Sequence, residues 1–207
     1  ALDCRPEEIA WSADQIQENT KSYIGPLFPG IFKLQNIENI YTSFPEGKVR
    51  KSELEIGGKT KVELVTELRA RGIKISDFAQ DMLDNPEFTT QPNPEQLDLV
   101  RLKVRDLGFP NGATTDQIYA KAEEYGLELC PAEVGLHQRL KDENQTMYER
   151  YRIAMKQILD RNGFPGVFGL EHCDDGLWLY DYWTGPDSEW FADYEFAFRL
   201  RNVSQAA

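Results

Sequence analysis

Apolar and polar residues alternate along several segments in the second half of the chain. From residue 99 to 105, Val100, Leu102 and Val104 alternate with basic residues. The same two-residue period recurs at 151–156, 167–173, 177–183 and 194–200. Successive side chains on a strand point to opposite faces, so this period predicts strands with at least one buried face. We therefore expect a sheet in the second half.

Residues 60–85 show helical spacing instead. Val62, Val65 and Leu68 share one face of a helix over 60–71, and the following glycine is a natural C-cap. Ile73–Ile75 alternates like a brief strand. Ser76 is then expected to cap a second short helix, which the Asn-Pro pair at 85–86 ends.

One further helix is expected after the first long strand. Thr114 and Gln117 have the spacing of a capping box, and Gly126 marks the end of a helix that runs to Tyr125. The strands that follow predict an antiparallel meander. The fold class is therefore α+β: a small α-rich N-terminal region at 1–90, including a helix over 12–25, then a β-α-β plus meander domain at 91–207. The Pro- and Asn-rich segment 89–94 is the expected linker.

The Asp174-Asp175-Gly176 segment predicts a hairpin. If Asp175-Gly176 is its two-residue turn, the alternation assigns each side chain to a face. One face holds Phe168, Leu170, His172, Leu179 and Trp183, and the other holds Val167, Glu171, Cys173, Trp178, Tyr180 and Tyr182. Both faces are rich in apolar groups. One is expected to pack on the helix; the other must be covered or serve as a binding surface.

The composition is that of a globular protein with an acidic excess. Apolar residues are 41% of the 207, aromatic residues 12%, and the net charge is −12. Nucleic-acid binding needs a basic surface, so we expect no nucleic-acid partner. The apolar runs are too short to cross a bilayer, so we expect no membrane contact by a spanning segment.

Cys4, Cys130 and Cys173 are widely spaced and odd in number, which predicts neither a disulfide framework nor a structural zinc site. We interpret them as reduced, buried thiols, which favours a cytoplasmic location, and the sequence indicates no cofactor. The chain begins with Ala rather than Met. A processed precursor, a trimmed chain and simple Met removal all fit, so secretion after processing stays open.

Aromatic and acidic residues concentrate near the C-terminus. Residues 178–198 hold nine aromatics, and the interval between Arg161 and Arg199 contains eight acids and no Lys or Arg. Trp183 and Trp190 bracket a loop and follow no strict period. Loop-edge aromatics stack on sugars, on cations or on a partner's apolar groups. We therefore expect a non-enzymatic binding module with an unknown small-molecule or protein ligand. Its ligand-binding residues are Trp183, Trp190, Asp181, Asp187 and Glu189.

Two other functions remain open. Asp181 and Glu189 beside tryptophans are the residue types of a glycosidase, which needs two carboxylates about 5–10 Å apart. The open sheet face is also a possible homo-oligomer interface of a structural subunit.

Three motifs that could carry chemistry favour structural roles instead. Gly57-Gly58-Lys59-Thr60 lacks the first glycine of a phosphate loop, so it predicts a helix N-terminus. His172 and Cys173 are neighbours on a strand and face opposite ways, which disfavours a shared metal. Cys130 lies among apolar residues and is expected to be a buried, inert thiol rather than a nucleophile.

Several stretches resemble an uncharacterised family of bacterial proteins. They are LQNIENIYTSFPEGKVRKSELEIGGKTKVELVTEL at 34–68, DLVRLKVRDLGFPNGATTDQIYAKAEEYGLELCPAEVG at 98–135, DDGLWL at 174–179 and FAFRLR at 196–201. The resemblance covers most of residues 34–201. It implies a recurring bacterial module and carries no activity, cofactor or catalytic residue.

Overall fold

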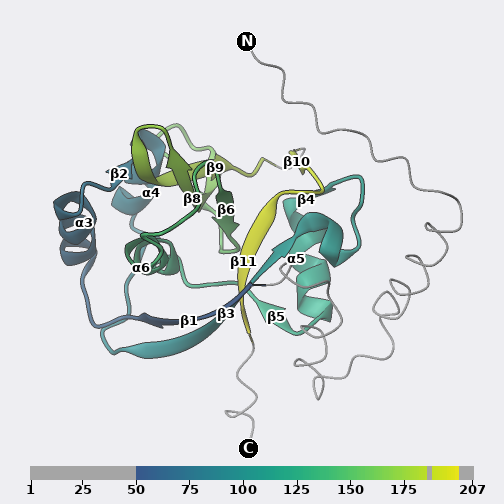
Figure 1. Ribbon diagram of the computed structural model, residues 1–207, viewed down its shortest axis with the longest axis horizontal. Coiled ribbons are helices and arrows are strands. Elements are labelled where there is room, and N and C mark those ends of the chain that lie inside the picture. The colour runs from purple at the N-terminus through teal and green to yellow at the C-terminus, as the bar shows by residue number, and fades with distance from the viewer. Residues whose placement is uncertain (1–49, 186–187, 201–207) are drawn as a thin grey trace, which may run out of the picture. The chain divides into compact units, whose positions relative to one another are not determined.

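The computed structural model describes residues 50–185 and 188–200 of the 207-residue chain (Figure 1). The described helices are α3 (Lys61–Ala70), α4 (Asp77–Asp84), α5 (Thr115–Glu124) and α6 (Val134–Lys141), with a 3₁₀ turn at Val104–Leu107. The described strands are β1 (Arg50–Ile56), β2 (Lys74–Ile75), β3 (Glu95–Lys103), β4 (Ala113–Thr114), β5 (Leu127–Glu128), β6 (Arg150–Ile153), β7 (Ile158–Leu159), β8 (Pro165–Cys173), β9 (Gly176–Trp183), β10 (Glu189–Trp190) and β11 (Glu195–Leu200). The predicted α+β class is therefore confirmed.

The chain divides into two compact units, Ala1–Ser43 and Phe44–Ala207. All described residues lie in the second unit, and the helix expected over 12–25 lies outside them. The division expected near residue 90 stays a prediction. Residues 89–94 form a loop between α4 and β3, and β1 pairs with β3 along its whole length across that loop. Pro and Asn mark a loop, but they do not distinguish an internal loop from a linker.

The main sheet has the strand order β1-β3-β11-β6-β8-β9-β2 among the described residues. The antiparallel succession β6-β8-β9 agrees with the expected meander. β11 departs from it because it inserts between β3 and β6, antiparallel to the first and parallel to the second. The two-residue period of β11 describes its faces but not its neighbours, so this central position could not be deduced from it.

Helices cover both faces of this sheet. On one face, Ala197 of β11 and Phe168 of β8 belong to a core that also contains Leu64 and Leu68 of α3. On the other face, Phe196 and Phe198 of β11 contact the ring of Tyr119 from α5. Figure 1 shows α5 on the opposite side of β3 and β11 from α3, α4 and α6. The α5 face is the one that carries the candidate site.

Two helices begin as predicted. Thr60 caps α3 and Thr114 caps α5, each in a complete capping box with Glu63 and Gln117. The predicted buried face of α3 is wrong at one position: Val62 is 70% exposed, and the core is formed by Leu64 and Leu68. Leu64 and Leu68 are one turn apart and lie on the same side of the helix.

Ser76 caps α4 as predicted, and its side chain accepts a hydrogen bond from the Ala79 backbone. Ala79, Met82 and Leu83 form the buried face of α4, whereas Phe78 is 44% exposed. Within the described residues, no helix is long and apolar enough to cross a membrane.

The β8–β9 hairpin has the predicted faces but a different turn. Cys173 pairs with Gly176, so Asp174 and Asp175 form the two-residue connection, one position earlier than expected. Gly176 has φ +116°, a conformation that glycine adopts without steric cost. The pairing moves by two residues across the hairpin, so the set of side chains on each face is unchanged.

Candidate functional site

Three aromatic side chains lie on the α5 face of β9 and form what we call the aromatic strip: Trp178, Tyr180 and Tyr182. Their ring centroids are 6.2 and 5.9 Å apart along the strand. Tyr180 is 39% exposed, and the other two are half-buried. The alternation of β9 places these rings on one face, as the sequence predicted.

β8 positions the inner end of the strip. A Cβ atom at Gly169 would lie 2.3 Å from the ring of Tyr182, so the absence of a side chain there gives this ring its place. The Tyr182 hydroxyl donates a hydrogen bond to the carboxylate of Glu171. Glu171 is only 7% exposed, and Arg150 lies 3.6 Å from its other oxygen. The hydrogen bond to Glu171 therefore holds the Tyr182 end of the strip in place.

Cations of the chain itself lie against both ends of the strip. The ammonium of Lys74 lies 5.1 Å from the centroid of the Trp178 ring. The guanidinium of Arg152 lies 3.9 Å from Tyr182 and 4.0 Å from Tyr194. In the described part of the chain, no cation is placed over Tyr180. The negative face of an aromatic ring attracts cations, and the Asp175 carboxylate, 2.7 Å from the Lys74 ammonium, also holds that ammonium beside Trp178.

Arg152 is the residue at this site that the sequence interpretation missed. It is 3% exposed, and burial lowers the pKa of its guanidinium. The alternation of 151–156 assigned it to a polar face, whereas it lies between aromatic rings. The local sequence carried no signal for this burial, because the rings that surround Arg152 belong to Tyr182, Trp190 and Tyr194, 30 or more residues later in the chain.

Trp190 is part of the core of this half of the molecule. It is 5% exposed, and its Nε1 donates a 2.8 Å hydrogen bond to Thr115 Oγ1 of α5. Its ring contacts Tyr182, Tyr194 and Phe196, with centroids 5.2–6.1 Å away. It therefore supports the strip from below rather than presenting a free surface.

Trp183 lies on the opposite face of β9 from Tyr182, because the two are neighbours on the strand. Its side chain is 55% exposed, and its ring covers Gly185. The structure therefore does not bring Trp183 and Trp190 together. Glu189 is exposed on β10, which pairs with β4, and Asp187 lies outside the described residues.

Asp181 shares the Trp183 face and is half-buried. Its carboxylate accepts a 2.6 Å hydrogen bond from Ser76 Oγ, and burial raises its pKa. A raised pKa is one of two features that a carboxylate hydrolase requires. The other is a second acid facing it in a concave pocket, and Asp181 lines none of the cavities described below.

Cys130 and His172 lie in surroundings that favour a structural role over a chemical one. Cys130 is buried, and burial raises the pKa of its thiol to about 12, which leaves the thiolate almost unpopulated at neutral pH. His172 Nδ1 lies 2.6 Å from the Gln145 carbonyl. Among the described residues, no three His, Cys, Asp or Glu side chains are arranged to hold a metal ion.

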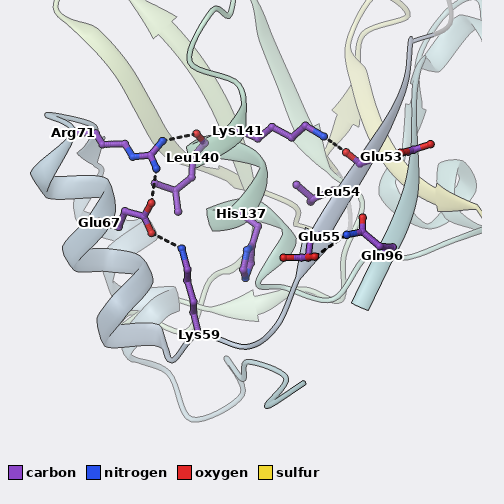
Figure 2. Close-up of a pocket in the computed structure, with 10 residues that line it drawn as sticks. All are labelled: Glu53, Leu54, Glu55, Lys59, Glu67, Arg71, Gln96, His137, Leu140 and Lys141. Atoms are coloured by element: carbon purple, nitrogen blue, oxygen red, sulfur yellow. Dashed lines mark hydrogen bonds and ion pairs between the residues drawn. The ribbon is translucent and has the colours of Figure 1, made fainter. Parts of the chain in front are cut away.

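A cavity of about 400 Å³ lies between β1, α3 and α6 (Figure 2). Its charged groups pair with one another: Glu67 accepts from both Lys59 and Arg71. Lys141 reaches across from α6 to the backbone carbonyl of Glu53. His137 lies on this wall, with its Nε2 3.4 Å from the buried carboxylate of Glu133. The Lys141 contact joins α6 to β1, and Arg71 at the end of α3 donates a 3.0 Å hydrogen bond to the Leu140 carbonyl of α6.

Comparison with known proteins adds no relative: no family model, no curated protein and no solved structure matches the chain. The functional argument therefore depends on the geometry of the described residues.

Proposed function

We propose that the protein is a non-enzymatic binding module whose aromatic strip contacts Lys or Arg side chains of a partner protein. The observation that supports this most directly is the pair of intramolecular cations, Lys74 on Trp178 and Arg152 on Tyr182, on either side of the exposed Tyr180. A partner's cation placed on Tyr180 would continue the same arrangement.

The charge of the molecule favours the same class of ligand. The net charge of the chain is −12, and the exposed acids Asp174 and Asp175 form the turn next to the strip. Asp175 pairs with Lys74, whereas Asp174 accepts only from the uncharged hydroxyl of Tyr148 among the described residues. A basic segment approaching this surface is attracted, and an acidic one is repelled.

The orientation of the rings argues against an extended sugar. Neighbouring rings of the strip are inclined by 72° and 59°. A flat sugar chain would stack on one of these rings at a time, because consecutive rings do not share a plane. A cation has no plane to match, so inclined rings suit it better.

The test compares Tyr180→Ala with Phe164→Ala. Phe164 is also exposed, at 55%, but lies outside the strip. The probe is a fluorescent peptide of alternating Arg and Ser, and its Glu-for-Arg counterpart is the charge control. We expect Y180A to weaken binding of the Arg peptide roughly 3- to 30-fold, the loss of one cation–π contact. F164A should bind like the unmodified protein.

Equal affinity of Y180A and F164A for the Arg peptide would show that the strip does not contact it. Equal affinity of the unmodified protein for the Glu and Arg peptides would show that charge does not select the ligand. Binding of a β-linked oligosaccharide that Y180A abolishes would favour a sugar ligand instead. Light scattering measures the mass of the protein in solution, and a strict monomer would exclude the hypothesis of a structural homo-oligomer.

A further inference from the structure

A second cavity, of about 290 Å³, shares Lys141 with the cavity in Figure 2. Its lining comes from β1, β3, α6 and its C-cap, β6 and β11, and consists of Lys51, Ser52, Leu99, Arg101, Gln138, Lys141, Asp142, Tyr151 and Ala197. None of its lining residues belongs to the aromatic strip. Its volume is at the small end of the range for ligand pockets.

A hydrogen-bond chain in this lining leaves one acceptor unused. Tyr151 Oη donates to Asp142 Oδ2 at 2.7 Å, so its oxygen accepts from Gln138 Nε2 at 3.1 Å. This sequence of donors fixes the orientation of the Gln138 amide. Its Oε1 is buried and has no hydrogen-bond partner in the described structure. A buried acceptor without a donor costs free energy, and a ligand donor can offset that cost.

The charges of the lining differ in how far they are compensated. Arg101 pairs with Glu149 and Glu195, at 2.5 and 3.0 Å, and is neutralised by them. Lys141 donates to a backbone carbonyl, and no ion pair of Lys141 with a described carboxylate is seen. Asp142 accepts a hydrogen bond from the uncharged hydroxyl of Tyr151, and its charge favours the charged form of the buried Arg139 without a direct ion pair between them in the described structure. A cation and a carboxylate that form no ion pair with the described residues therefore line the same small cavity.

We propose that this cavity binds a free α-amino acid. The ammonium group of the ligand would donate to Asp142 and to Gln138 Oε1. Its carboxylate would accept from Lys141, with Lys51 beside it, and its side chain would lie against Leu99 and Ala197. An amino acid carries both charges on one carbon, and the cavity offers both partners within about 290 Å³.

The experiment measures binding of each of the common L-amino acids, one at a time, by ligand-observed NMR and calorimetry. The N-acetyl and the carboxamide derivatives of the strongest binder lack one charge each. Asp142→Asn and Lys141→Met remove the matching charge of the protein, and the amide oxygen introduced by D142N can still accept from Tyr151. Asp84→Asn and Lys121→Met are controls, because both residues pair at the surface on other helices.

We expect at least one amino acid to bind, and both derivatives to bind at least about tenfold more weakly. D142N and K141M should weaken binding by a similar factor while retaining the unfolding midpoint of the controls. The proposal is overturned if no amino acid binds at about 10 mM. It is also overturned if either derivative binds as well as the parent, or if folded D142N and K141M bind normally.

Discussion

At the scale of single residues, glycine conformation is set by the neighbouring chain, whereas the burial of Trp190 is set by contacts with distant segments. Gly72 and Gly126 have positive φ after their helices, as the capping pattern indicated. Trp190 could not be placed in the same way, because its hydrogen-bond partner Thr115 is 75 residues away in the chain. Backbone conformation is a local property, whereas the burial of a loop aromatic depends on contacts that no local pattern contains.

Gly57 and Gly163 allow a matched test of close backbone contact. Both have positive φ, +76° and +82°, but a Cβ at Gly57 would lie 2.2 Å from the Asn93 carbonyl oxygen, and nothing lies within 4 Å of one at Gly163. We expect Gly163→Ala to cost about 1 kcal/mol and Gly57→Ala roughly 2 kcal/mol more. Urea unfolding measures both, and equal losses would contradict the contact.

Asp181 and Asp175 should respond to pH in opposite directions. Burial raises the pKa of Asp181 in the folded protein, so its ionisation costs stability as pH rises through the folded pKa. Lys74 lowers the pKa of Asp175, so that carboxylate stabilises the fold above its unfolded pKa and loses this effect as pH falls.

Replacing each with Asn removes these effects. Between about pH 3 and pH 7, the stability of Asp181→Asn relative to the unmodified protein should rise with pH, and that of Asp175→Asn should fall. Urea titrations at several pH values give the two slopes. Slopes of the same sign would show that the assigned surroundings of one carboxyl are wrong.

At the scale of elements, strands and capped helices were predictable and strand neighbours were not. The alternation located β8, β9 and β11, helical spacing located α3, and a capping box located α5. The central place of β11 depends on pairing with strands that begin about 45 and 100 residues earlier. The strip followed from alternation alone, whereas the two cavities are formed by segments distant in sequence.

The start of α5 offers a test at this scale. Thr114 accepts a hydrogen bond from the Gln117 backbone and completes a capping box. Thr66 lies inside α3, and its hydroxyl bonds only back to Val62 O among the described residues. We expect Thr114→Ala to lower the free energy of unfolding by about 1 kcal/mol and Thr66→Ala to change it by under about 0.5 kcal/mol. Similar values for both would show that the cap contributes little.

At the scale of the second unit, one sheet face of its described part is divided between the helix α5 and the aromatic strip. α5 lies over Phe196 and Phe198 of β11, while the β9 portion of the same face carries the strip. Trp190 contacts Tyr182 of the strip and Phe196 of β11, and Arg152 lies over the rings of Tyr182 and Trp190. A surface supported by buried groups in this way can keep its rings fixed before a partner arrives, which lowers the entropic cost of binding.

The most direct measurement is an NMR titration of the ¹⁵N-labelled protein with the alternating Arg-Ser peptide. We predict that the largest shifts fall on the backbone amides of residues 178–182 and on the indole N–H of Trp178, and that they weaken as salt is added. Saturable binding with those resonances unmoved, and with the shifts elsewhere on the protein, would contradict the account.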